Sequence, residues 1–133
     1  MVRHFATISK KAVGMGTYLI KAKYTTAAFK GMLESPSDRA GAYRELADAV
    51  GIEVREIFFS LSSSEIVILA DGDKEQMAIS ELVTMAGGSF SQIDTLELIN
   101  TGDLEALTRK AADFASVYKP PTMDEIDRVL LDE

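Results

Sequence analysis

The sequence predicts an α+β fold, in which one antiparallel sheet has helices packed on only one of its faces. Stretches with the alternating pattern of strands and stretches with the apolar spacing of helices succeed one another between Thr17 and Asn100. Their order is β-α-β-β-α-β, the split βαβ pattern of ferredoxin-like domains. We expect this domain over residues 17–101, between an N-terminal extension, residues 1–16, and a C-terminal helical extension, residues 102–133.

The first half of the domain is predicted to contain a strand, Thr17–Tyr24, followed by two helical segments. Both tyrosines of the strand fall on one face, whereas Lys21 and Lys23 fall on the other. The helical stretch breaks at Ser35-Pro36-Ser37, because proline disfavours helical backbone at the residue before it. The second helical segment is centred on Ala40–Val50, and the glycine that follows it is typical of a helix end.

The second half begins with two strands, Ile52–Leu61 and Glu65–Asp71, joined by three serines. A helix over Lys74–Ala86 follows, with Asp73 as its expected N-cap. The last strand is expected at Phe90–Asn100, where apolar residues alternate with polar ones.

The C-terminal extension is predicted to be helical. Gly102–Tyr118 has one apolar stripe at helical spacing, and Lys119-Pro120-Pro121 then forms a short stiff break. The segment Thr122-Met123-Asp124-Glu125 matches a capping box and predicts one further short helix.

The third strand is apolar toward both sides, since Ile66–Ala70 contains no polar side chain. Whichever of these residues face the helices, two large aliphatic side chains remain on the other face. Leaving each of them in water forfeits about 1.5–3 kcal/mol. Phe58 or Phe59 adds another apolar group, so we predict an interface at Phe58, Val67 and Leu69. A second subunit, a ligand or the acidic tail of the chain could cover this face.

The charge balance argues against nucleic acid as a partner. Formal net charge is −7, whereas a nucleic-acid-binding domain is expected to present a basic face. Charge is uneven, because the first 33 residues hold six basic side chains and no acid, and the segment after Thr122 is acidic. These ends are either solvated or meet an oppositely charged partner, such as the tail of another subunit.

Cysteine is absent, which excludes disulfides and thiolate metal sites and fits a reducing compartment. No run approaches 18 apolar residues, so we expect no membrane span and a cytoplasmic protein.

Five stretches of the chain share a pattern with a known family: Thr17–Thr25, Ser37–Arg39, Ala49–Gly51, Phe58–Leu61 running into the Glu65–Leu69 strand, and Thr95–Thr101. The pattern resembles that of GYD-domain proteins. At the motif that names the family, Gly-Glu-Tyr-Asp, this chain has Ser62-Ser63-Ser64-Glu65, which keeps the acid but neither the glycine nor the tyrosine. The resemblance implies a ferredoxin-like domain akin to dimeric α+β barrel proteins, whose two sheets pack face to face. It implies no particular activity.

Few side chains suggest chemistry. His4 is the only histidine and lies outside the expected domain, so we predict no metal site, no cofactor and no catalytic residue. Lys21 and Lys23 could bind an anionic ligand on the open face, or they could pair with carboxylates such as Glu53, Glu56 or Glu97 at a subunit interface. Glu65 could be a polar ligand group or the plain charged start of a strand.

Two functions follow from these observations. The first is a homo-oligomeric, cytoplasmic, non-enzymatic domain without nucleic-acid or membrane partners. The second is a small-molecule binder or cofactor-free enzyme, with a cavity between the sheet and a partner subunit. The residues predicted to line that cavity are Tyr18, Lys21, Lys23, Phe59 and Glu65.

Overall fold

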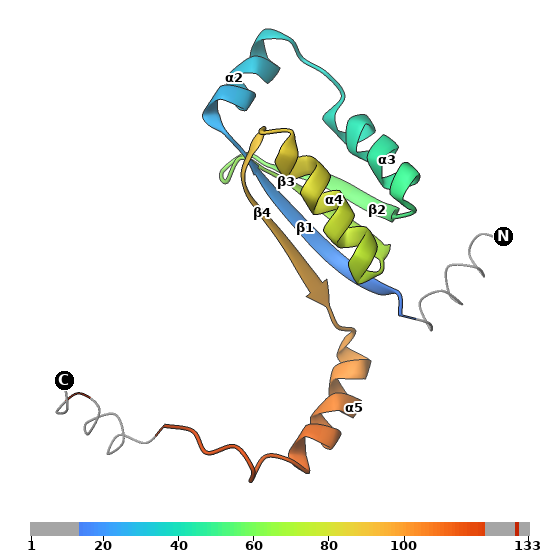
Figure 1. Ribbon diagram of the computed structural model, residues 1–133, viewed down its shortest axis with the longest axis vertical. Helices are drawn as coiled ribbons and strands as arrows, with labels where there is room; N and C mark the ends of the chain where they lie inside the picture. The colour runs from blue at the N-terminus through green and yellow to red at the C-terminus, as the bar shows by residue number, and fades with distance from the viewer. Residues whose placement is uncertain (1–13, 122–129, 131–133) are drawn as a thin grey trace, which may run out of the picture. The chain divides into compact units, whose positions relative to one another are not determined.

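The computed structural model describes residues 14–121 and residue 130 (Figure 1). It divides into two compact units, with the division between Leu98 and Ile99. The first unit contains β1 (Gly16–Tyr24), α2 (Thr26–Glu34), α3 (Arg39–Val50), β2 (Glu53–Ser60), β3 (Glu65–Gly72), α4 (Lys74–Ala86) and β4 (Phe90–Leu98). The second unit contains α5 (Thr101–Ala112).

The four strands form one sheet in the order β2-β3-β1-β4, and every neighbouring pair is antiparallel. The first and third strands are therefore central, as the βαββαβ order predicts. Helices α3 and α4 cover the same face of this sheet (Figure 1), and side chains from both pack into one core with β1 and β3. The predicted ferredoxin-like α+β fold is confirmed.

Local signals in the sequence set the ends of the helices. Thr25 caps α2 by accepting a hydrogen bond from the backbone N–H of Ala28 at 3.0 Å. Asp38 caps α3 in the same way, after the predicted break at Ser35-Pro36-Ser37. Gly51 ends α3 with φ of 98°, a left-handed conformation that glycine adopts without steric cost.

The start of α4 is fastened to the end of α3. Asp73 and Gln76 form a reciprocal capping box, with hydrogen bonds of 2.8 and 2.9 Å between side chains and backbone. The amide nitrogen of the Gln76 side chain also donates to the Gly51 carbonyl oxygen at 3.1 Å. This bond joins the start of α4 to the end of α3.

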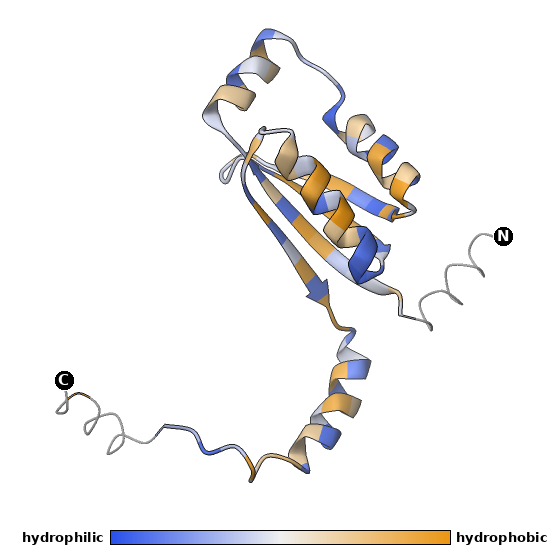
Figure 2. Cartoon of the chain, in the orientation of Figure 1, coloured by the Kyte–Doolittle hydropathy of each residue, from blue (hydrophilic) through white to orange (hydrophobic). Residues whose placement is uncertain are grey.

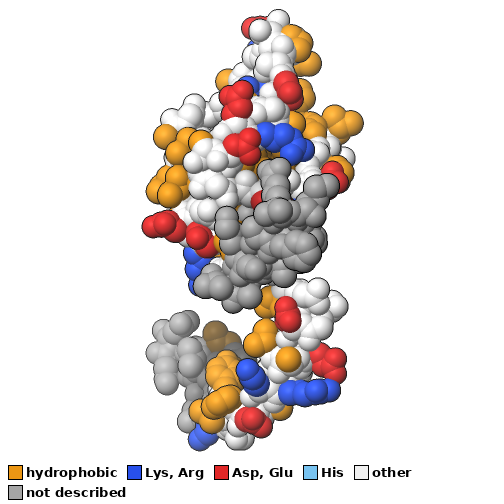
Figure 3. All heavy atoms as spheres, turned by 90° about the vertical axis from the view of Figure 1, so that its right-hand side faces the viewer, with side chains coloured by type: hydrophobic (Ala, Val, Ile, Leu, Met, Phe, Trp, Pro, Cys, Tyr) orange, Lys and Arg blue, Asp and Glu red, His pale blue; other side chains and the backbone are white. Residues whose placement is uncertain are grey.

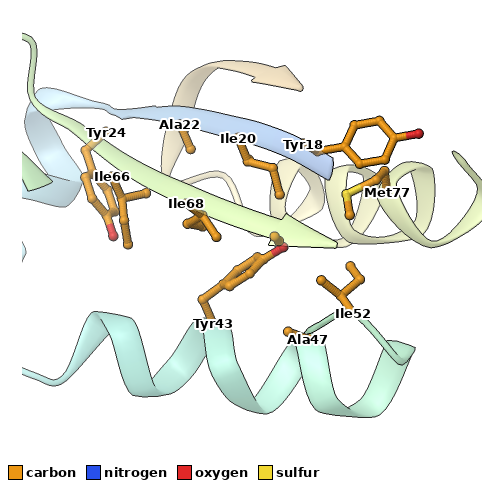
Figure 4. Close-up of a cluster of buried hydrophobic side chains, with 11 residues drawn as sticks. Tyr18, Ile20, Ala22, Tyr24, Tyr43, Ala47, Ile52, Ile66, Ile68 and Met77 are labelled. Carbon is orange, nitrogen blue, oxygen red and sulfur yellow. The ribbon is translucent and has the colours of Figure 1, made fainter. Parts of the chain in front are cut away.

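The core lies between the sheet and these two helices. Figure 4 shows Tyr43 pointing from α3 toward the strands, where it meets the aliphatic side chains of β1 and β3. The buried hydrophobic residues are Tyr18, Ile20, Ala22, Tyr24, Tyr43, Ala47, Ile52, Ile66, Ile68, Ala70 and Met77.

Two element ends differ from the sequence prediction by more than one residue. The last strand ends at Leu98 rather than Asn100, because Asn100 caps α5 by accepting from the backbone N–H of Gly102 at 2.8 Å. Helix α5 stops at Ala112 rather than Tyr118. Its residues are exposed, with polar and apolar side chains alternating along it (Figure 2). The short helix predicted from Thr122 lies outside the described residues.

No helix within the described residues is long and apolar enough to cross a membrane.

Candidate functional site

The register of the strands divides their side chains between two faces of the sheet. Residues paired directly across antiparallel strands point to the same side, and Ile20 pairs with the buried Ile68 beneath the helices. Leu19 pairs with Leu69 on β3 and with Leu96 on β4, so these three leucines point to the opposite side. We call this opposite side the open face, because neither α3 nor α4 covers it.

An apolar band crosses the open face, as the two-sided third strand predicts. Phe58 and Leu96 stand at its two edges with 60% and 45% of their surface exposed, and the side chains between them are half-buried. The band consists of Leu19, Phe58, Val67, Leu69, Leu96 and Leu98. The three residues predicted to form an interface, Phe58, Val67 and Leu69, all belong to it.

Charged side chains lie beside the apolar band. Lys21 is opposite Val67 on one side and Asp94 on the other, and Lys23 is opposite Glu65. Among the described residues, neither lysine forms an ion pair. The open face therefore presents both signs of charge next to apolar surface.

The five residues predicted to line one cavity do not share one face. Lys21, Lys23 and Glu65 lie on the open face. Tyr18 pairs with Ala70 and Phe59 pairs with Ile66, so both aromatic side chains belong to the helix-covered face. Burial raises the pKa of the Tyr18 phenol, and the nearby carboxylates of Glu97 and Asp73 raise it further.

Asp71 is a buried acid that the sequence alone does not distinguish from a turn residue. Only 1% of its surface is exposed, and it accepts hydrogen bonds of 2.7 Å from both Thr17 Oγ1 and Arg55 Nε. Arg55 reaches it because a bulge between Val54 and Glu56 inserts one extra residue into β2. These contacts tie together strands β1, β2 and β3, which indicates a structural role.

A cavity of about 240 Å³ lies on the helix-covered face, between the sheet and helices α3 and α4. Its floor is aliphatic and comes from three strands: Ile20, Ala22, Ile66, Ile68 and Ile93. Its walls include Tyr43 and Leu46 from α3 and Ser80, Val83 and Thr84 from α4. We call it the helix-side cavity.

Several polar groups line the helix-side cavity. The hydroxyl oxygens of Tyr43 and Ser80 lie 2.9 Å apart, and both residues are buried. Burial raises the pKa of the Tyr43 phenol, against the lowering effect of its hydrogen bond with Ser80. On the α4 side, Thr95 Oγ1 donates to Glu81 Oε1 at 2.9 Å. Arg39, the first residue of α3, also lines the cavity.

A second cavity of about 410 Å³ lies beside the first. It is lined by α2, the start of α3 and the edge strand β2, and it shares Tyr24, Arg39 and Ile66 with the helix-side cavity. The Tyr24 ring packs on Phe90 with ring centroids 4.7 Å apart. Because Arg39 lines both cavities, its side chain is close to each of them.

Sequence reasoning gave no role to Arg39 or Ser80. A signal for Ser80 was present, because it interrupts the apolar stripe of α4 three residues after the buried Met77. The cavity itself depends on the spacing between α3 and α4, which no local pattern encodes.

Within the described residues, no group of three or more histidine, aspartate or glutamate side chains could hold a metal ion. Acidic side chains are spread over the surface seen in Figure 3, interspersed with basic and hydrophobic ones.

Comparison with curated proteins and with solved structures gives no match for this chain. A family model does match: the GYD domain, over residues 18–108. The match spans more than half of the chain and covers all of the sheet from Tyr18 onward together with α2, α3 and α4. The chain belongs to the GYD domain family.

Proposed function

We propose that this GYD domain works as a homodimer, in which the open faces of two copies pack against each other. The apolar band is the observation that supports this proposal. Six apolar side chains lie together on a face that neither α3 nor α4 covers, and an apolar patch of this kind marks an interaction site. Packing two copies together removes both bands from water at once.

The charges beside the band suit a second copy of the same chain. Lys21 and Asp94 are direct neighbours across β1 and β4, so the same surface carries a cation next to an anion. A two-fold interface brings identical patches together, and each residue away from the axis then meets a different residue of the partner. A patch with both signs of charge can align opposite charges in this way. A uniformly acidic patch on a chain of net charge −7 would repel its copy.

Replacing Leu96 with glutamate tests the proposal. Leu96 is on the edge strand β4 and already half-exposed, so the substitution leaves the helix-side core intact. Leu61→Glu is the matched control, because Leu61 is 84% exposed in the turn between β2 and β3. Light scattering coupled to size exclusion should give twice the 14.5 kDa chain mass for the wild type and for Leu61→Glu.

The same measurement should give 14.5 kDa for Leu96→Glu, with an unchanged circular dichroism spectrum. A wild-type chain that stays monomeric at about 100 µM would contradict the proposal, because interfaces of standard size hold well below that concentration. A Leu96→Glu variant that stays dimeric would contradict the choice of face.

The alternative function is small-molecule binding, or cofactor-free catalysis, in a cavity between the open face and a partner. It has weaker support, because Tyr18 and Phe59 point away from Lys21, Lys23 and Glu65. The cytoplasm is the compartment that we propose from the composition.

A further inference from the structure

We propose that the helix-side cavity binds a small monocarboxylate with an apolar body, such as an aromatic or branched aliphatic acid. This goes beyond association through the open face, because the cavity lies on the other side of the sheet. Three observations carry the proposal: an aliphatic floor, a hydroxyl pair with a hydrogen to spare, and an arginine without an acidic partner.

The floor and the volume define the body of the ligand. Five of the strand residues that line the cavity are aliphatic and two are aromatic, and the hydroxyl of the remaining one, Thr95, already donates to Glu81, so the sheet side suits an apolar body. A cavity of about 150 Å³ with such a lining binds benzene. At about 240 Å³, the helix-side cavity has room for a ring or a branched chain together with a carboxylate.

The hydroxyl pair offers a donor. Tyr43 and Ser80 together have two hydroxyl hydrogens, and only one of them lies between the two oxygens. Among the described residues, neither side chain has any other hydrogen bond. A buried hydroxyl without an acceptor costs free energy, so a ligand oxygen placed beside the pair is favoured.

Arg39 offers the positive charge. It lies one helical turn before Tyr43 on α3, so both side chains belong to the same stripe of the helix. Within the described residues it forms no ion pair, and its one hydrogen bond is a long one of 3.4 Å to Ser37 Oγ. A guanidinium binds a carboxylate through two parallel hydrogen bonds.

The location of Arg39 strengthens this argument. A cation in the first turn of a helix opposes the helix dipole, and α3 has no acidic residue in that turn. The carboxylate of Asp38 already caps this helix end, and a bound carboxylate would in addition pair with the arginine. Glu81 lines the α4 wall and would repel an anion, so the ligand should turn its carboxylate toward Arg39.

The test uses benzoate as the probe and the full chain labelled with ¹⁵N. Titration should shift backbone amide signals of α3, α4 and the strands beneath them, with a dissociation constant on the order of 1 mM. Benzyl alcohol has the same ring without the charge, and we expect it to bind about fivefold more weakly. Equal affinities for benzoate and benzyl alcohol would overturn the assignment of a carboxylate.

Two pairs of variants locate the site. Ala42→Leu fills the cavity from the exposed side of its wall and should abolish the benzoate shifts, whereas Ala49→Leu, on the same helix but outside the cavity, should not. Arg39→Gln should weaken benzoate about fivefold and leave benzyl alcohol unchanged. Arg44→Gln, also on α3 but away from the cavity, should change neither.

Benzoate binding that survives Ala42→Leu, or an absence of shifts in the wild type at about 20 mM benzoate, would overturn the proposal. The Leu96→Glu variant separates the two proposals. If the cavity is correctly assigned, Leu96→Glu binds benzoate with the dissociation constant of the wild type, whether or not the variant forms a dimer.

Discussion

The two faces of the sheet are built from the same four strands, yet they differ in how they are covered. On the helix-covered face, Ile68 is 2% exposed and lies beneath α3 and α4. On the open face, the next residue, Leu69, is only half-buried. A step of one residue along β3 therefore leads from the face that α3 and α4 cover to the face that they leave open. The comparison shows that β3 is apolar toward both faces of the sheet, although α3 and α4 cover only one of them.

The two faces also differ in where they place polar groups. Asp71 on the open-face side has its carboxylate held by two donors, Thr17 and Arg55, at 2.7 Å each. The hydroxyls of Tyr43 and Ser80 on the helix-covered face have one donor left over. A polar group with every partner in place stabilises the fold, and a group with capacity to spare is available to a ligand.

The largest expected effect compares two neighbouring residues. Ile68→Ala should lower the free energy of unfolding by about 3 kcal/mol, because it removes most of a buried aliphatic side chain and enlarges the space beside it. Leu69→Ala should cost about 1 kcal/mol in dilute protein, since the side chain is already half in water. Urea unfolding at low and high protein concentration measures both. The loss of stability caused by Leu69→Ala should grow with protein concentration, and the loss caused by Ile68→Ala should not. A Leu69→Ala cost that is the same at every protein concentration would contradict the claim that the open face associates.

The next effect concerns Asp71. Asp71→Asn should lower the free energy of unfolding by about 2 kcal/mol, because the buried side chain loses its charge and keeps only one oxygen to accept from Thr17 and Arg55. Glu56→Gln is the control, since Glu56 is exposed on the same face, opposite Leu69. It should change the stability by less than about 0.5 kcal/mol. An Asp71→Asn variant as stable as the control would show that the buried carboxylate has no structural role.

A smaller effect is expected for the hydroxyl pair. Tyr43→Phe should cost about 1 kcal/mol, because it leaves the buried Ser80 hydroxyl without its partner. Ser80→Ala should cost a similar amount. Since the two changes break the same bond, the double variant should cost less than the sum of the single ones. Additive costs in thermal or chemical unfolding would mean that the two hydroxyls do not interact.

The smallest effect is on the pH dependence of stability. The pKa of Tyr43 is raised above its usual value of 10.0 in the folded chain, so the folded state holds this proton more tightly than the unfolded state. The resulting stability is fully present below pH 10 and is lost as the pH rises through the folded pKa. Above pH 10, the wild type should lose stability more steeply than Tyr43→Phe. Identical slopes for the two proteins would contradict the shift.

Much of the fold could be predicted from local signals. Asp73 before α4 and Gly51 after α3 are found where the capping patterns put them, because caps act within one turn of the chain. The order of strands and helices was likewise sufficient to predict the sheet. The end of β4 was misplaced by two residues because the sequence did not show that Asn100 would cap the next helix.

The candidate sites were harder to predict. The alternation within β1 already puts Tyr18 and Lys21 on opposite faces, so the five-residue cavity conflicted with the pattern that suggested the strand. Whether Phe58 or Phe59 reaches the open face depends on the bulge in β2, which shifts the register after Val54. The helix-side cavity depends on how far apart two helices settle over a sheet, and that distance is a property of the packed chain.

The central claim is that a second copy covers the open face, and labelled methyl groups test it most directly. With a soluble paramagnetic agent, the methyl signals of Leu69 and Val67 should be protected in the wild type at about 200 µM, like those of the buried Ile68, whereas those of Leu61 should be broadened. In Leu96→Glu, the paramagnetic agent should broaden the methyl signals of Leu69 and Val67 to the degree expected for half-exposed side chains. The signal of Ile68 should stay protected. Leu69 and Val67 signals that are broadened equally in the wild type and in Leu96→Glu would contradict the account.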